Sequence, residues 1–321
     1  MMESRPPTLS VIIVSWNVRE LLRRALASLY ASWGDRPGLE IIVVDNDSDD
    51  DSVAMLRAEF PQVQVIANSD NRGFTVGNNQ GLTCAHGDFL LLLNPDTEVE
   101  GEALWQLLDY ANNHPRVGML GPRLLNPDGS TQSSRRRFPT LPVLFLESTW
   151  LQGLLPRRVL RSYYAQEHPD AAVQTVDWIT GAAMLTRREV VAQVGGLDEG
   201  FFMYSEELDW CRRIKEAGWK IVYYPEARIV HHEGKSSEQV VPARHSYFQS
   251  SKVYYTRKYH GRLVSESLRW WLLAQYVWQL GVEGAKWLLG NRRTLRAERL
   301  AAYRQVLRSG LRRSAPELGP V

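Results

Sequence analysis

The chain contains only two cysteines, Cys84 and Cys211, among its 321 residues. Two cysteines are too few for a disulfide framework, and they suit a protein of a reducing compartment. No third or fourth Cys or His follows them at the spacing of a zinc site. The cysteine content therefore argues against a secreted, disulfide-rich protein and against a structural zinc protein.

The chain also lacks a large excess of charge of either sign. Its formal net charge is +2, and its 44% hydrophobic and 23% charged residues are ordinary for a globular protein. This balance is too mild to argue for nucleic acid as a partner. The opening MMESRPPTLS has no apolar segment, so we expect no secretory signal. The length suits one large α/β domain with an appendage, or two ordinary domains.

Two familiar nucleotide-binding motifs are absent, since the sequence contains neither G-x-G-x-x-G nor G-x-x-x-x-G-K-[ST]. What it does contain is a regular alternation of strand-like and helix-like segments. We expect strands at 9–15, 40–45, 63–68 and 88–94, and helices at 18–30, around Met55, and at 75–85. Strands built almost entirely of Val, Ile and Leu predict a parallel sheet covered by helices on both faces.

The pattern of apolar residues also predicts elements in the later parts of the chain. Residues 127–175 are irregular and predict surface loops or short helices. Helix 206–217 follows, and the stretch WKIVYYPEARIVHHEG predicts short strands that close the sheet. After Gly234 the pattern is helical to the end.

Polar side chains stand where successive strands end. These residues are Ser15, Asn17, Asp45, Asn46, Asn94 and Asp96. The intervening NRGFTVGNNQG supplies Arg72, which can neutralise a phosphate, and Gly73, which lets backbone approach a ligand. Asn and Asp commonly end strands, and Asp96 could instead cap a helix starting near Gly101. The repetition at one sheet edge favours a nucleotide site.

A second constellation is FFMYSEELDWCRR, with Glu206, Glu207 and Asp209. Acidic residues favour a helix N-terminus, which is the simpler explanation. The preceding GGLDEGFFMY favours a pocket, where clustered carboxylates can supply a general base. His231 follows an apolar strand as Asp96 does, and histidine is a common metal ligand, although a histidine at a strand end is usually structural.

Taken in order, SVIIVSWN, IIVVDNDSDDDS, NRGFTVGNNQG, LLLNPDTEV, WITGAAMLTRR and GGLDEGFFMYSEELDW resemble glycosyltransferase family 2, in its rhamnosyltransferase-like branch. The resemblance covers about Leu9 to Gly234. It implies an α/β GT-A fold with a mostly parallel sheet, and an inverting enzyme of surface polysaccharide synthesis. The donor would be a dTDP-, UDP- or GDP-sugar, the cofactor Mg²⁺ or Mn²⁺, and the acceptor a hydroxyl of a glycan or lipid-linked sugar. We accordingly predict a catalytic domain at 1–235 and a helical extension at 236–321.

The resemblance also assigns roles to residues. Asp45 matches the contact to the nucleotide base, and Asp96 the metal-diphosphate carboxylate, in a motif that reads Asn94-Pro95-Asp96 here. Glu207 matches the catalytic base, with Glu206 as the alternative, and His231 matches a metal ligand. The segment around WITGAAM matches the acceptor side, where we place Trp178, Thr180, Gly181 and Asp209.

The extension differs in kind from the rest of the chain. Trp270, Trp271, Trp278 and Trp287 lie among leucines, and the Arg-rich segment that follows contains Arg292, Arg293, Arg296, Arg299, Arg304, Arg308, Arg312 and Arg313. This pattern predicts an interfacial helix, and hence a cytoplasmic enzyme held peripherally on the inner face of the membrane. The alternative is a helical pair that packs on the catalytic domain or on a second subunit, in a homodimer.

Two other functions fit parts of the pattern. One is a non-catalytic nucleotide-sugar-binding module. The presence of all three of Asp96, Glu207 and His231 argues against it. The other is a sugar nucleotidyltransferase, which would normally carry a glycine-rich loop after its first strand. The corresponding VSWNVRE has no glycine.

Overall fold

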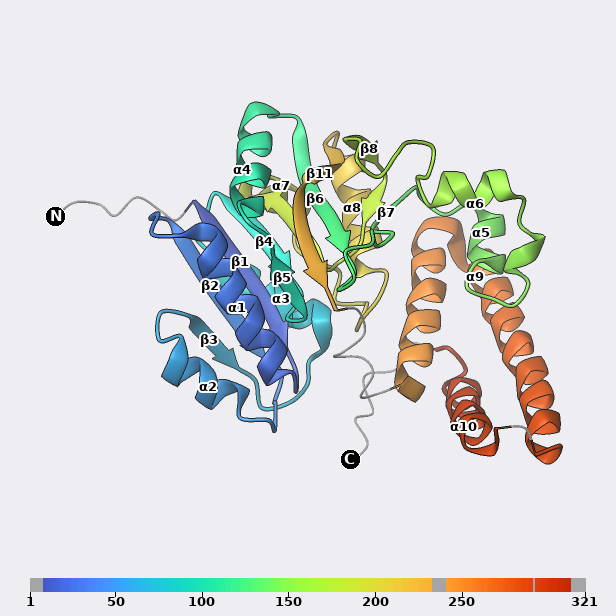
Figure 1. Ribbon diagram of the computed structural model, residues 1–321. Coiled ribbons are helices and arrows are strands. Elements are labelled where there is room, and N and C mark those ends of the chain that lie inside the picture. Colours follow the sequence, from blue (N-terminus) through green and yellow to red (C-terminus); the bar gives the residue numbers. More distant parts are fainter. Residues whose placement is uncertain (1–7, 233–240, 291, 313–321) are drawn as a thin grey trace. The chain divides into compact units, whose positions relative to one another are not determined.

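The computed structural model describes residues 8–232, 241–290 and 292–312 (Figure 1). They divide into two compact units, which we treat separately. The sheet unit comprises the described parts of Met1–Phe138, Arg161–Glu199 and Glu207–Ser236, and the helical unit those of Pro139–Leu160, Gly200–Glu206 and Ser237–Val321. The expected domain boundary at residues 235 and 236 lies outside the described residues, and the assignment of separate functions to the two parts stays a prediction.

Nine of the strands in the described residues form one sheet, in the order β3-β2-β1-β4-β10-β6-β11-β5, with β8 paired to β11. Their bounds are β1 Leu9–Ser15, β2 Leu39–Asp45, β3 Gln64–Ala67, β4 Phe89–Leu93, β5 Thr97–Val99, β6 Val117–Leu125, β8 Gln174–Val176, β10 Ala183–Arg187 and β11 Lys220–His231. The first four in the order pair in parallel, as do β6 and β11. By contrast, β10 is antiparallel to β4 and β6, and β5 and β8 are antiparallel to β11. The expected α/β sheet is confirmed, with its parallel pairs confined to these two groups.

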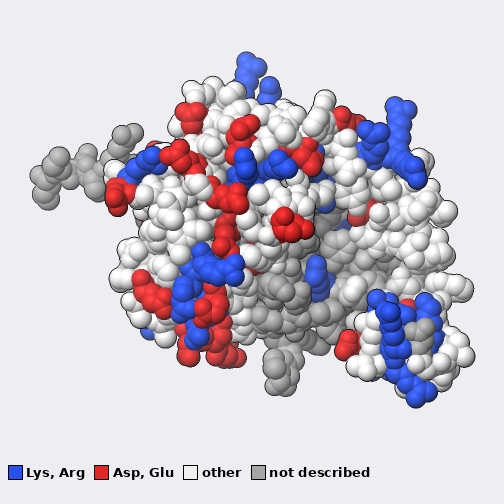
Figure 2. All heavy atoms as spheres, in the orientation of Figure 1, with Lys and Arg blue, Asp and Glu red and all other residues white. Residues whose placement is uncertain are grey.

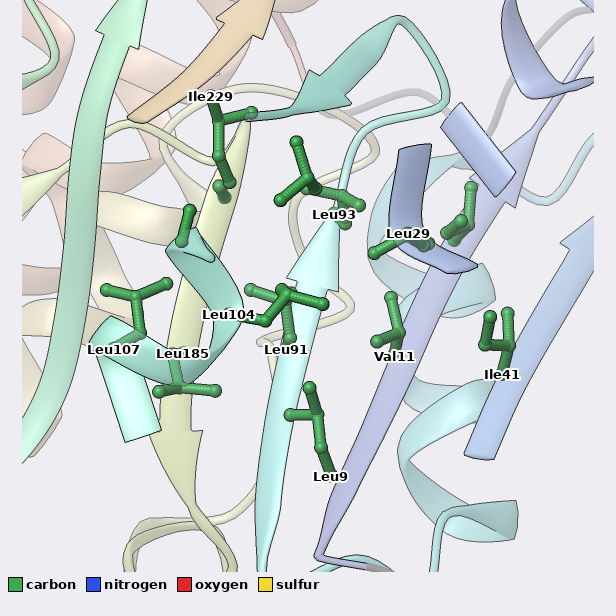
Figure 3. Close-up of a cluster of buried hydrophobic side chains, with 14 of the residues drawn as sticks. Leu9, Val11, Leu29, Ile41, Leu91, Leu93, Leu104, Leu107, Leu185 and Ile229 are labelled. Atoms are coloured by element: carbon green, nitrogen blue, oxygen red, sulfur yellow. The ribbon is translucent and has the colours of Figure 1, made fainter. Parts of the chain in front are cut away.

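The helices of the sheet unit are α1 Arg19–Trp33, α2 Ser52–Glu59, α3 Gly73–Cys84, α4 Ala103–Asn113, α7 Arg188–Val194 and α8 Glu206–Glu216, and a small separate sheet pairs β7 Arg135–Arg136 with β9 Trp178–Ile179. Alternate residues of β1 face opposite sides, as the period of a strand requires. Leu9 and Val11 lie in the core with Leu29 of α1 and Leu104 of α4 (Figure 3). The other face of β1 meets α3.

Helix α3 lies unusually close to β1 because glycines replace larger residues at the contact. A Cβ at Gly77 would stand 2.9 Å from Val14, and one at Gly81 would stand 2.3 Å from Ile12. Such distances are shorter than van der Waals contact, so any larger residue would push the helix away. The close packing fixes the N-terminus of α3, at Gly73, against the carboxyl edge of the sheet.

Most expected elements are present, and one differs. Strand β1 has the expected bounds, and α1 begins at Arg19, one residue later than expected. The short strands expected within WKIVYYPEARIVHHEG are wrong, because this stretch is the single strand β11. The register of its pairing with β6 shifts between Tyr224 and Arg228, and this irregularity accommodates Pro225 without ending the strand.

The two cysteines are both free. Cys211 lies in α8, fully buried, with its Sγ 3.6 Å from Sδ of Met119. Burial raises the pKa of the Cys211 thiol to about 12. Cys84 is the last residue of α3 and is partly exposed.

The helical unit contains α5 Leu141–Leu146, the 3₁₀ turn η1 Gln152–Leu154, the first part of α6 Arg157–Tyr163, and the long helices α9 Val241–Leu288 and α10 Arg293–Ser309. Helix α9 is interrupted at Gly261, whose φ of 82° is not helical. Leu268, Leu272 and Tyr276 of α9 pack around Val306 of α10. A search of the described helices finds none with the length and apolar character to span a membrane.

Candidate active site

Asp45 lies at the carboxyl end of β2, opposite Ser15 at the end of β1. Its carboxylate is 1% exposed, and Oδ1 accepts a hydrogen bond from the Ser48 backbone N–H at 2.9 Å. Within the described residues Oδ2 has no hydrogen-bond partner, and neither has the buried Ser15 hydroxyl. Burial raises the pKa of Asp45. A buried acceptor without a donor is costly, so a ligand that donates to Asp45 would stabilise this site.

The two asparagines predicted beside Asp45 shape the loops around it. The Asn17 backbone N–H donates to Oγ of Ser48, and the Asn17 Oδ1 accepts from the Asp49 backbone N–H. Asn46 donates from Nδ2 to the Gly73 carbonyl at 3.1 Å, and its Oδ1 accepts from Asn68. Their amides are therefore used to join β1, β2 and α3. Ser48 contacts both Asp45 and Asn17 and was not predicted from sequence.

The N-terminus of α3 lies at this edge of the sheet. Gly73 has a φ of 81°, in the left-handed region that favours glycine, and its N–H donates to Asn71 Oδ1. Arg72, at the N-cap position, has an exposed side chain. A helix N-terminus carries partial positive charge, so Arg72 and the first turn of α3 together favour an anionic group.

Asp96 and His231 meet at the same edge. Asp96 Oδ1 lies 3.3 Å from His231 Nε2, and both side chains are largely buried. In the part of the chain that the structure describes, neither Asp96 Oδ1 nor Asn94 Oδ1 accepts a hydrogen bond. The alternative in which Asp96 caps the next helix is wrong, because α4 begins at Ala103 with Glu102 at the N-cap position.

Gln132, which the sequence analysis missed, fixes the histidine. Its Nε2 donates to the His231 carbonyl at 2.7 Å, so its Oε1 faces the ring and lies 2.9 Å from His231 Nδ1. Nδ1–H must then be the donor, which leaves the lone pair of a neutral ring on Nε2, towards Asp96. A carboxylate oxygen and an imidazole nitrogen facing one another fit a divalent cation. A search of the described residues finds no group of three or more His, Cys, Asp or Glu side chains that could hold a metal.

Glu207, the predicted base, lies in the first turn of α8. A Cβ placed on Gly181 would stand 3.8 Å from the Glu207 Cβ and 3.9 Å from the ring of Phe74 in α3. Glu207 thus lies beside the predicted acceptor segment and close to the first turn of α3. Its neighbour Glu206 is grouped with the helical unit, whereas Glu207 belongs to the sheet unit with Asp45, Asp96 and His231.

The backbone leading into α8 is strained. Tyr204 and Ser205 have φ values of 69° and 64°, in a region that residues other than glycine rarely adopt. Such conformations cost free energy and persist only where surrounding structure imposes them, most often at functional sites. The strain directly before α8 therefore supports a functional role for the start of this helix.

The other residues predicted on the acceptor side have different environments. Trp178 donates from Nε1 to the Arg137 carbonyl, and the buried Thr180 hydroxyl has no hydrogen-bond partner within the described residues. Asp209 is fully buried, 2.8 Å from Nε of Arg213, whose guanidinium also donates to the carbonyls of residues 194 and 196. The structure thus brings Gly181 beside Glu207 and places Asp209 in a buried ion pair instead.

The chain was compared with known proteins. The family profile described as "Glycosyl transferase family 2" matches residues 10–195, and "Glycosyl transferase family group 2" matches residues 157–311. The N-acetylglucosaminyl-diphospho-decaprenol L-rhamnosyltransferase of Mycobacterium tuberculosis is 30% identical over 82% of this chain and 86% of its own length. Rhamnosyltransferase WbbL of Escherichia coli is 25% identical over 69% of this chain and 82% of its own.

The fold has a relative of known structure. Mannosyltransferase PcManGT from Pyrobaculum calidifontis, solved in complex with GDP-Man and Mn²⁺, superposes with a TM-score of 0.54 at 16% identity, over 96% of this chain and 86% of the other. This likeness concerns the fold, and it confirms the expected GT-A architecture. The sequence matches decide the family: the chain is a glycosyltransferase and belongs to glycosyl transferase family 2.

Proposed function

We propose that the chain transfers a sugar from a nucleotide-diphosphate donor to a hydroxyl of a glycan or lipid-linked acceptor, with inversion, in the synthesis of a surface polysaccharide. Rhamnose is the first sugar to test, because two relatives are named as rhamnosyltransferases. The observation that carries the proposal is the pair Asp96 Oδ1 and His231 Nε2, 3.3 Å apart, at the sheet edge that also holds Asp45.

The donor nucleotide would lie along the ends of β1, β2 and β4. Asp45 has an unpartnered, buried Oδ2 that can accept from a base N–H or a ribose hydroxyl. The N-terminus of α3 and Arg72 favour the diphosphate. In this proposal the base lies at the Asp45 end of the site and the sugar at the Asp96 end.

The residues present fit a divalent cation, Mg²⁺ or Mn²⁺. Asp96 Oδ1 and His231 Nε2 would hold it. When bound, such a cation offsets the negative charge that develops on the leaving diphosphate. Gln132 keeps the lone pair of His231 directed at this position.

The transfer itself needs a base on the acceptor side, and we assign this role to Glu207. The acceptor oxygen attacks the anomeric carbon, its proton passes to the Glu207 carboxylate, and the bond from that carbon to the diphosphate oxygen breaks. The nucleoside diphosphate leaves with the electron pair. Attack opposite the leaving group in one displacement inverts the configuration at the anomeric carbon.

The experiment has two parts. Thermal shift with dTDP-, UDP- and GDP-sugars, with and without Mn²⁺, identifies the donor. Release of nucleoside diphosphate is then measured with and without candidate acceptors, because a binding module would release none. A sugar nucleotidyltransferase would not form nucleoside diphosphate in an acceptor-dependent reaction.

The matched variants are Asp96→Ala and, as a control, Asp109→Ala on the exposed side of α4. Asp96→Ala should remove transfer and the metal-dependent part of donor binding while the protein remains folded. Asp109→Ala should leave both unchanged. Donor binding that responds to Mn²⁺ equally in wild type and Asp96→Ala would overturn the assignment.

A further inference from the structure

The second segment of α9, residues 262–288, has an exposed apolar face. Trp270, Val277 and Trp278 are 61%, 59% and 60% exposed. Together with the exposed Ala274 they follow the three- and four-residue spacing of one helix face. We call this face the α9 stripe, and it consists of Leu263, Trp270, Ala274, Val277, Trp278 and Leu288. From residue 270 to residue 285 of this described segment, no exposed position carries a charge.

The stripe is not the face that holds the helical unit together. The other side of the same segment packs on α10, through Leu268, Leu272 and Tyr276 around Val306. Glu283, the one acidic residue of the C-terminal half of the segment, is buried on that side and pairs with Arg296 of α10. The stripe is therefore apolar surface beyond what the core of this unit uses.

Apolar surface continues from the stripe to α5. Trp271 donates from Nε1 to the Phe145 carbonyl and lines an open groove of about 330 Å³ with Leu141, Pro142, Phe145 and Leu146. Seven residues later, on the same side of the helix, Trp278 stacks on Trp150 with ring centroids 6.3 Å apart. Trp150 is itself 56% exposed. Exposed tryptophans and a groove without polar lining thus form one surface within the helical unit.

The residues of α9 and α10 carry an excess of positive charge. Arg293 of α10 is exposed, with its guanidinium 5.6 Å from the ring of Trp287, whereas Arg269, 4.5 Å from the ring centre of Trp270, is buried and paired with Glu266. Residues 244–312 contain fourteen Lys and Arg residues against three Glu, although the whole chain has a net charge of only +2. Basic side chains gather over α10 in Figure 2. Of the tail arginines named above, Arg313 lies outside the described residues.

From these observations we infer that the α9 stripe is a docking surface for an anionic lipid bilayer, with the helix lying in the plane of the headgroups. An in-plane helix buries its tryptophans at the boundary of the acyl chains, and the excess positive charge of residues 244–312 attracts the helical unit to anionic headgroups. A second copy of the chain fits less well, because two units with this excess of positive charge would repel one another. The inference does not depend on which sugar or acceptor is used. Docking through the α9 stripe would hold the enzyme peripherally on the inner face of the cytoplasmic membrane.

The test uses the full chain and co-sedimentation with vesicles of phosphatidylcholine, with or without phosphatidylglycerol. Val277→Glu places a charge on the stripe, and Gln305→Glu places the same charge at an exposed position of α10. Burying an unpaired carboxylate at the interface should weaken partitioning by about tenfold or more, whereas Gln305→Glu should change it by about twofold or less. Circular dichroism and donor binding confirm that both variants fold.

Wild-type protein should sediment with the anionic vesicles, less so at high salt and hardly at all with phosphatidylcholine alone. Failure of the wild-type protein to sediment with anionic vesicles at low salt would overturn the inference. An equal loss of vesicle binding in Val277→Glu and Gln305→Glu would do the same. Sedimentation velocity without lipid supplies a third arm. A dimer that Val277→Glu dissociates, in protein that does not bind vesicles, would assign the stripe to self-association instead.

Discussion

Gln132 offers a direct test of how the candidate metal site is built. The variant Gln132→Met keeps the length of the side chain and removes both contacts to His231, the one to its carbonyl at 2.7 Å and the one to Nδ1 at 2.9 Å. Without an acceptor at Nδ1, the ring is free to rotate and to adopt the other tautomer. His231 then no longer presents its lone pair to the cation position beside Asp96.

The size of the effect follows from the two lost contacts. Each hydrogen bond contributes about 0.5–1.5 kcal/mol, so together they account for about 1–3 kcal/mol. Loss of a residue that orients a metal ligand usually weakens metal affinity by about 10–100-fold, which is about 1.4–2.8 kcal/mol and falls in the same range. We therefore expect the Mn²⁺ concentration for half-maximal donor binding to rise by about this factor in Gln132→Met.

The assay is a titration of donor binding with Mn²⁺, by calorimetry, for wild type, Gln132→Met and Gln132→Glu. The glutamate keeps an oxygen acceptor for Nδ1–H and loses the Nε2 donor to the His231 carbonyl and to Asn126 Oδ1, so most of the Mn²⁺ response should return. If Gln132→Met has the wild-type Mn²⁺ response while His231→Ala has lost it, Gln132 does not position the histidine.

Two further predictions concern the base and the nucleotide. Glu207→Gln should retain donor binding and lower the turnover number by about 10²-fold or more, whereas Glu206→Gln should not, and the reverse result would make Glu206 the base. Burial raises the pKa of Asp45 in the folded chain, so the folded state holds this proton to higher pH than the unfolded state does. The stability that the protonated carboxyl contributes is present below its ordinary pKa and is lost as the pH rises through the raised value. Asp45→Asn should thus raise the melting temperature relative to wild type, and the increase should be larger at about pH 7 than at about pH 3. The same variant should weaken donor binding. A higher melting temperature for wild type than for Asp45→Asn at about pH 7 would refute this reasoning.

Strands β1, β2 and β4 could be predicted because their sequences are mostly Val, Ile and Leu. Strand β1 and the end of β2 have the expected positions. The direction of β10 could not be predicted, because side-chain alternation reports a period and not a direction. Between β6 and β10 the chain also passes through residues 139–160 of the helical unit, which the pattern of the strands does not reveal.

Only some residues of the candidate site could likewise be predicted from sequence. Asp45 and Asp96 were accessible from sequence because each lies at or shortly after the carboxyl end of a buried strand. Gln132 was not, because it reaches His231 across 99 residues of sequence through a loop. Asp209 could have been interpreted better, since Arg213 stands four residues later on the same helix, at the spacing of an ion pair.

The unequal environments of the two cysteines make the protein easy to label. A thiol reacts as its thiolate, and at neutral pH the buried Cys211, with its pKa raised to about 12, remains protonated and out of reach of a reagent. Cys84 is partly exposed and ends the helix whose first residue, Gly73, lies at the candidate nucleotide site. A maleimide dye would therefore attach once per molecule without any cysteine being engineered, at the far end of α3. Fluorescence from that position provides an optical report on the helix that packs against β1 through Gly77 and Gly81.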